Sequence, residues 1–108
     1  MKNITPRETY DQLQAGKICL IDVREQEEYD QAAIEGAILA PLSNLVTEIE
    51  NIKIPDNQPV IFQCRSGVRS AQAIEYLEQN LLKGYELYNM AGGILAWIED
   101  GLPIIQGS

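Results

Sequence analysis

Short apolar runs alternate along the chain with longer segments in which apolar residues recur at helical spacing. The continuous run from Ile18 to Val23 is typical of a strand with both faces buried. The expected strands are 18–23, 36–41, 60–63 and 86–90, and the expected helices are 6–15, 25–31, 43–51, a segment from Ser70 to a stop at Gly84, and 94–98, ending at Gly101. This alternation predicts an open α/β sheet whose active site lies at the carboxyl ends of the strands.

Local signals place the helix ends. Thr5-Pro6-Arg7-Glu8 is a capping box with proline at the first helical position, and Gly16 is a stop signal for the same helix. Ser43 is expected to cap the helix that continues to about Asn51, and Pro55–Pro59 is expected to be a loop.

Composition narrows the class of protein. With 108 residues, 45% hydrophobic and 22% charged, the chain is expected to form one domain over 1–108. Its net charge of -8 and pI near 4.3 disfavour binding to nucleic acid or to an anionic membrane. No export signal and no apolar run of about 18 residues is present, so we expect no membrane span. Two cysteines, Cys19 and Cys64, favour a cytoplasmic protein with free thiols.

The absence of histidine excludes two common kinds of site. A triad built on histidine and a zinc site containing histidine are both impossible, and two cysteines cannot form a four-thiolate site. We therefore expect no metal and no cofactor, and a nucleophile of another kind.

The connection between the strand 60–63 and the next helix has an unusual composition. It reads Cys64-Arg65-Ser66-Gly67-Val68-Arg69. A loop that leads into a helix can point backbone N–H groups inward, and Gly67 permits the tight turn. Such a nest, with the two arginines, would favour the Cys64 thiolate and bind a small anion.

Three of the arginines are expected at carboxyl ends of strands: Arg24, Arg65 and Arg69. They would form a positive island in an acidic protein. The alternative is that Cys64 is a small buried residue and the arginines form surface ion pairs. The combination of six residues at this place in the fold favours a functional site.

These residues resemble the active-site loop of the rhodanese homology domain, the thiosulfate sulfurtransferases. The resemblance covers nearly the whole chain, and its segments occur in the family's order: Leu20–Glu25 with Glu28-Tyr29, Ile34–Ala37, Cys64–Ser70, and Met90–Ile94 with Trp97. One departure is Ala32-Ala33, where the family usually has Gly-His. We expect this difference to affect local packing more than chemistry.

The resemblance implies a fold and a reaction. The fold would be a five-stranded parallel sheet flanked by helices, with the fifth strand around Ile4. Cys64 would take the outer sulfur of thiosulfate or a similar small anionic donor and become a persulfide held by residues 65–69. Cyanide, a thiol or a sulfur-accepting protein would then remove the sulfur, and the cycle needs no histidine.

The length and composition of the loop also help to distinguish a sulfurtransferase from other activities. Four residues lie between Cys64 and Arg69, the length of the sulfur-transferring members, whereas related phosphatases have one more. A cysteine-dependent phosphatase is therefore the runner-up enzyme. Arg65 resembles the thiosulfate-using members more than the mercaptopyruvate-using ones. A non-enzymatic sulfur carrier or regulatory module is a further alternative, although regulatory members usually lack the cysteine.

Other polar and aromatic residues have simpler explanations. Asp22 and Arg24 are expected to form a supporting ion pair near the loop, and Ser70 either donates to the bound anion or caps the helix. Cys19 and Trp97 are expected in the core. A solvated helix face is expected for the carboxylates of Glu25, Glu27, Glu28 and Asp30.

Overall fold

The computed structural model, which describes residues 1–106, contains a five-stranded parallel sheet. The strands are β1 (Asn3–Ile4), β2 (Cys19–Asp22), β3 (Ile38–Leu39), β4 (Val60–Gln63) and β5 (Leu87–Met90), in the spatial order β1-β5-β4-β2-β3. β1 pairs with β5, which confirms the expected strand around Ile4. The fold predicted from the sequence is therefore confirmed.

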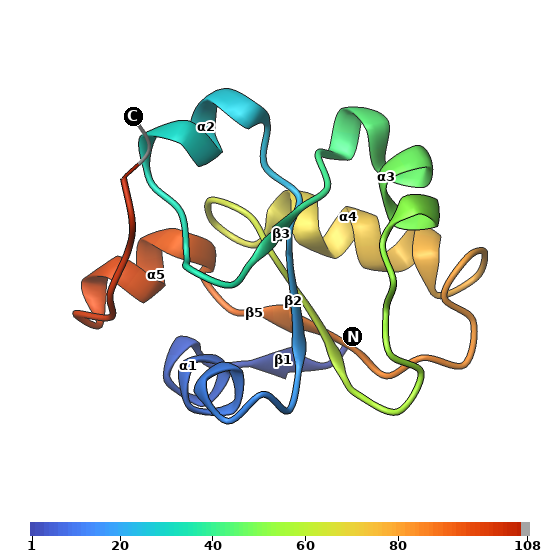
Figure 1. Cartoon of the computed structure of the whole chain (residues 1–108), viewed down its shortest axis with the longest axis horizontal. Coiled ribbons are helices and arrows are strands. Elements are labelled where there is room, and N and C mark those ends of the chain that lie inside the picture. The colour runs from blue at the N-terminus through green and yellow to red at the C-terminus, as the bar shows by residue number, and fades with distance from the viewer. Residues whose placement is uncertain (107–108) are drawn as a thin grey trace.

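Helices cover both faces of this sheet (Figure 1). They are α1 (Pro6–Gln14), α2 (Gln26–Gln31), η1 (Leu42–Asn44, a 3₁₀ turn), α3 (Leu45–Asn51), α4 (Val68–Leu77) and α5 (Gly93–Glu99). α1 and α5 pack on one face, and α3 and α4 pack on the other. α2 buries no residue and follows β2 directly at the carboxyl edge of the sheet.

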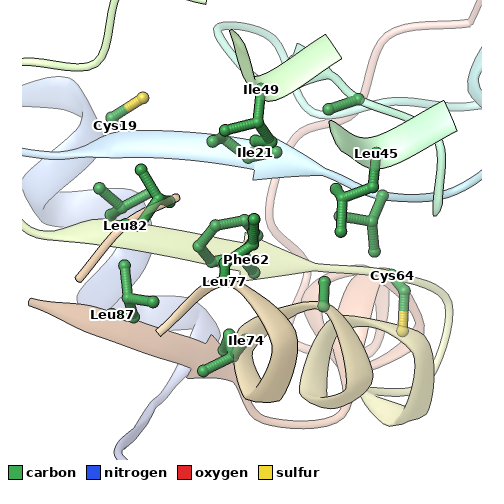
Figure 2. Packing of buried hydrophobic residues seen from close by; sticks show 14 residues of the cluster. Cys19, Ile21, Leu45, Ile49, Phe62, Cys64, Ile74, Leu77, Leu82 and Leu87 are labelled. Carbon is green, nitrogen blue, oxygen red and sulfur yellow. The ribbon is translucent and has the colours of Figure 1, made fainter. Parts of the chain in front are cut away.

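Each face has its own hydrophobic core. Phe62 of β4 packs with Leu45 and Leu77 on the face covered by α3 and α4, as Figure 2 shows. On the other face, Trp97 is 1% exposed and lies edge-on to Tyr10, with ring centroids 5.7 Å apart. The expectation that Trp97 belongs to the core is confirmed. The packing of both cores fixes the positions of the strands within the sheet, and therefore the positions of the loops that follow them.

Several predicted element ends are wrong. α4 begins at Val68, two residues before Ser70, and ends at Leu77 instead of continuing toward Gly84. Ser43 caps no helix: it lies in η1, and its hydroxyl donates to Glu25 at 2.7 Å. The third strand is shorter than 36–41 because only β3 pairs, and it pairs at the sheet edge with β2 alone.

The parallel strands bring three connections to one edge. β2, β4 and β5 are in register, with Asp22 beside Gln63 and Phe62 beside Asn89. The segments that follow these strands therefore meet at the carboxyl edge, where α/β folds place their ligands. Within residues 1–106, no helix has the length and apolar character needed to cross a membrane.

Candidate active site

Cys64 directly follows β4 and begins the turn that leads into α4. Gly67 is the N-cap of α4. Its φ of 105° lies in a region of backbone conformation that residues with a Cβ rarely adopt. This conformation turns the Gly67 N–H back toward the cysteine, and its nitrogen lies 3.0 Å from Cys64 Sγ. The amide contact expected from the sequence is thus present.

The surroundings of Cys64 favour the thiolate. The residue is 1% exposed, and Figure 2 shows its sulfur next to the first turn of α4. Burial acts to raise the pKa of this thiol, but the Ser70 hydroxyl and the backbone N–H groups of Ser70, Gly67 and Ser66 outweigh it, so the pKa is lowered. The hydroxyl oxygen of Ser70 lies 3.4 Å from Sγ. The Ser70 hydroxyl and the amide nest therefore account for the lowered pKa, and the sequence interpretation names this nest together with the two arginines.

α5 holds the first part of the loop from the other side. The backbone N–H groups of Ile94 and Leu95 donate to the carbonyl oxygens of Cys64 and Arg65, at 2.8 and 3.2 Å. Gly93 makes this approach possible, because a Cβ on it would lie 2.5 Å from the carbonyl carbon of Arg65. Gly93 therefore allows α5 to pack directly against the loop.

The three arginines of the expected positive island have different environments. Arg24 is 4% exposed and pairs with Asp22 at 2.8 Å, as expected; it also donates to the carbonyl oxygens of Glu28 and Ala32. This pair ties the end of β2 to α2. Arg65 is exposed, and its side chain makes no hydrogen bond or ion pair with any of residues 1–106.

Arg69 is held by α2. Its two terminal nitrogens donate to the two carboxylate oxygens of Glu28, at 2.6 and 2.8 Å. The hydrogen bond and charge of Arg69, partly opposed by burial, lower the pKa of Glu28 to about 2. Glu28 therefore does not belong to a simple solvated face, and that expectation is wrong for this residue.

The Glu28–Arg69 pair should stabilise the protein in a pH-dependent way. Glu28→Gln is expected to reduce the free energy of unfolding at neutral pH by about 1 kcal/mol, because the pair is bidentate but a third exposed. Since folding lowers the pKa of Glu28 from 4.5 to about 2, its contribution is complete above pH 4.5 and is lost as the pH falls toward 2.

Urea unfolding across the acid range checks this prediction. The variant should lose less stability than the parent protein below pH 4.5. Glu27→Gln is the matched control, because Glu27 is exposed in the same helical turn and makes no ion pair with the described residues. Equal pH dependence in both variants would contradict the assignment.

The remaining residues of the loop and the first turn of α4 differ in their exposure to solvent. Ser66 and Val68 are exposed beside Cys64, and Val68 is 64% exposed. Ser70 is fully buried inside α4, so it does not cap that helix.

Cys19 is buried on β2, as expected, and burial raises the pKa of its thiol. Among residues 1–106, no group of three or more acidic or thiol side chains could hold a metal ion.

Sequence reasoning did not identify Asn89. This residue lies on β5, is 7% exposed, and contacts both Ser70 and Gly67. A polar residue near the carboxyl end of an otherwise apolar strand is the signal that could have marked it. The role of Glu28 had a weaker signal, since it stands three residues after Glu25 and accepts the Glu25 N–H at the start of α2.

Comparison with known proteins agrees with this geometry. The model of the rhodanese-like domain matches residues 5–100. A protein of Allochromatium vinosum named sulfurtransferase is 39% identical over 89 residues, covering 82% of this chain and 78% of that protein. The probable adenylyltransferase/sulfurtransferase MoeZ of Mycobacterium tuberculosis is 39% identical over 103 residues, or 93% of this chain; the chain spans only 25% of its length.

A solved structure shares the arrangement over nearly its whole length. The rhodanese-related protein of Thermoplasma volcanium superposes with a TM-score of 0.83 at 28% identity, covering 97% of this chain and 98% of that one. Fold, loop and sequence similarity agree, and the chain belongs to the rhodanese-like domain family.

Proposed function

We propose that this protein is a sulfurtransferase that carries sulfur as a persulfide on Cys64. The observation that supports this most directly is the environment of the Cys64 sulfur, which lies 3.0 Å from the Gly67 N–H and 3.4 Å from the Ser70 hydroxyl. The thiolate is the reactive form of cysteine, and these donors stabilise it without a general base.

The proposed cycle has two displacements. The Cys64 thiolate attacks the outer sulfur of thiosulfate; a bond forms from Sγ to that sulfur, and the original sulfur–sulfur bond breaks. Its electron pair leaves with sulfite. In the second step, cyanide or a thiolate attacks the outer sulfur of the persulfide, and the electron pair of the broken bond returns to Sγ. Thiolate is restored, and no cofactor or external oxidant is needed.

The arginines support a small anionic donor. Arg65 is exposed beside Cys64 and its guanidinium is unpaired among residues 1–106, so it is available to bind thiosulfate. Arg69, also proposed to bind substrate, is engaged by Glu28 on both terminal nitrogens. We therefore assign donor binding mainly to Arg65, and to Arg69, whose charge is balanced by Glu28, the anchoring of α4 to α2.

Arg65→Ala should test this division. We expect the KM for thiosulfate to rise about tenfold with a smaller change in kcat, because one charge-assisted contact is lost. Arg65→Lys keeps the charge and should recover part of the loss. Steady-state kinetics with cyanide as acceptor measures both, and an unchanged KM in Arg65→Ala would show that the donor binds elsewhere.

The proposed reaction is tested by mass spectrometry after thiosulfate treatment. Trypsin separates the two cysteines, since Cys19 lies in the peptide 18–24 and Cys64 in the peptide 54–65. The expected result is one added sulfur atom on the second peptide, and its loss as thiocyanate when cyanide is added.

The alternatives give different results. A persulfide that forms without turnover would indicate a sulfur carrier instead of an enzyme. Hydrolysis of an aryl phosphate that depends on Cys64 would indicate a phosphatase. If thiosulfate adds no sulfur to Cys64 and no thiocyanate forms, the proposed reaction is wrong. The cytoplasmic location stays a prediction from the sequence.

A further inference from the structure

Asn89 links the two groups that contact the Cys64 sulfur. Its Nδ2 donates to the carbonyl oxygen of Gly67 at 3.1 Å, and its Oδ1 accepts the Ser70 hydroxyl at 2.6 Å. It is 7% exposed on β5, so the core fixes its position. The side chain does not contact the sulfur, but both of its partners do.

The orientation of the Asn89 amide is determined by the loop. The carbonyl oxygen of Gly67 can only accept, so the NH₂ group of Asn89 must face it. The amide oxygen must then face Ser70. Because an amide oxygen can only accept, the Ser70 hydroxyl has to supply the hydrogen in this contact.

Ser70 has only one hydroxyl hydrogen and two neighbours that can accept it. Asn89 Oδ1 lies at 2.6 Å and Cys64 Sγ at 3.4 Å. When the sulfur is a neutral thiol, the shorter bond to Asn89 is favoured, and the thiol can donate its own hydrogen to Ser70 Oγ. When the sulfur is a thiolate, a charge-assisted bond to Sγ becomes favourable.

We propose that Asn89 is a positioning residue that competes with the Cys64 sulfur for the single hydroxyl hydrogen of Ser70. The hydroxyl points to Asn89 when Sγ is neutral and turns to Sγ when Sγ carries the charge. Asn89 thus limits how strongly Ser70 stabilises the thiolate, while its other end holds Gly67 in place.

This competition would follow the two displacements, a consequence that rests on the proposed function. In the free thiolate the charge is on Sγ, and Ser70 donates to it. In the persulfide the charge is on the outer sulfur, so the hydroxyl can return to Asn89. When the acceptor removes that sulfur, charge returns to Sγ and the hydroxyl turns again.

The charged groups around Cys64 are the same in the parent protein, in Asn89→Leu, in Ser70→Ala and in the double variant. They are Arg65 in the loop, Arg69 of α4 with its partner Glu28 of α2, and the Asp22–Arg24 pair at the end of β2. The side facing β5 and α5 contributes Asn89 and glycine, which are neutral. Differences in ionisation among the variants therefore report the Ser70 hydrogen bond and the Gly67 contact.

A double-mutant cycle separates these two contributions. Asn89→Leu is made in the parent protein and in Ser70→Ala, and the rate of iodoacetamide alkylation at Cys64 is followed from pH 5 to 10 by mass spectrometry of the peptide 54–65. Each rate is divided by the rate on the high-pH plateau, where Cys64 is fully ionised, and this corrects for differences in the access of iodoacetamide to the sulfur. Without Ser70, only the effect through Gly67 remains, so the difference between the two backgrounds isolates the competition.

The expected result has a defined sign. Below the plateau, Asn89→Leu should increase alkylation about fivefold more in the parent protein than in the Ser70→Ala background. Additive effects would overturn the proposal, and the opposite sign would show that Asn89 directs the hydroxyl toward the sulfur. No sulfur donor is used, so failure here is distinct from failure of the transfer reaction.

Two further variants serve as a substitute for Asn89→Leu and as a control. If Asn89→Leu does not fold, Asn89→Asp goes through the same cycle with the opposite sign expected, because a carboxylate holds the hydroxyl more strongly. Tyr88→Phe is the control on the same strand: it removes a 2.9 Å hydrogen bond to Glu86 that does not involve the site. This control should leave Cys64 alkylation unchanged, and a shift equal to that of Asn89→Leu would mean that any weakening of β5 alters the thiol.

Discussion

Gly93→Ala is expected to reduce the free energy of unfolding by about 3 kcal/mol or more, a large part of the stability of a domain of this size. A Cβ at this position would overlap the carbonyl oxygen of Cys64 and lie 2.5 Å from the carbonyl carbon of Arg65. These are backbone atoms that cannot rotate away, so α5 would have to move from the loop. Movement would break the hydrogen bonds of Ile94 and Leu95 to it.

Gly101→Ala is the matched control for this substitution. Both glycines have positive φ, 60° at Gly93 and 76° at Gly101, but nothing lies within 4 Å of a Cβ on Gly101. The control should therefore cost only backbone strain, about 1 kcal/mol. Chemical denaturation of both variants measures the difference. Equal losses would mean that the approach of α5 to the loop is not close enough to exclude a methyl group.

The sheet was predictable because its signals are local. Apolar runs such as Ile18–Val23 identify strands buried on both faces, and Thr5 with Glu8 identifies the start of α1, where both hydrogen bonds of the capping box form. β1 has only two residues and no pattern of its own. It was expected only from the family resemblance, because its pairing with β5 joins opposite ends of the chain.

The limits of α4 were harder to predict for a physical reason. Ser70 is a good capping residue by type, but Gly67 ends the loop earlier by taking a left-handed conformation. Beyond Leu77 the chain continues in turns to Gly84, although Leu81 keeps the apolar spacing. Periodicity shows which residues face the core, but it does not show where hydrogen bonding ends.

The local geometry of the loop was predictable from its composition, whereas the contacts of its side chains with distant segments were not. Cys64 and Gly67 lie as the loop composition predicts, because a nest depends on adjacent backbone groups. The partner of Arg69 is Glu28, 41 residues away, and the partner of Ser70 is Asn89, 19 residues away. No local pattern encodes such pairs, which exist only after β2, β4 and β5 align.

Cys64→Ser is expected to reduce sulfur transfer from thiosulfate to cyanide by at least about 10³-fold. The hydroxyl of serine is far less acidic than a thiol, and the groups that contact the Cys64 sulfur within residues 1–106, the Gly67 N–H and the Ser70 hydroxyl, include no base that could remove its proton. Serine fits the same space, so the loop should retain its structure. Loss of activity with an unchanged thermal unfolding curve would show that the sulfur atom itself is required.

Cys19→Ser provides the comparison within the same chain. Cys19 is 8% exposed on β2, and burial raises the pKa of its thiol, whereas hydrogen bonding lowers that of Cys64. At neutral pH the two thiols should differ strongly in reactivity, so Cys19→Ser should retain full transfer activity and lose only some stability. Activity is measured as thiocyanate formed. If Cys19→Ser removed as much activity as Cys64→Ser, the sulfur would pass through both cysteines and the cycle through Cys64 alone would be wrong.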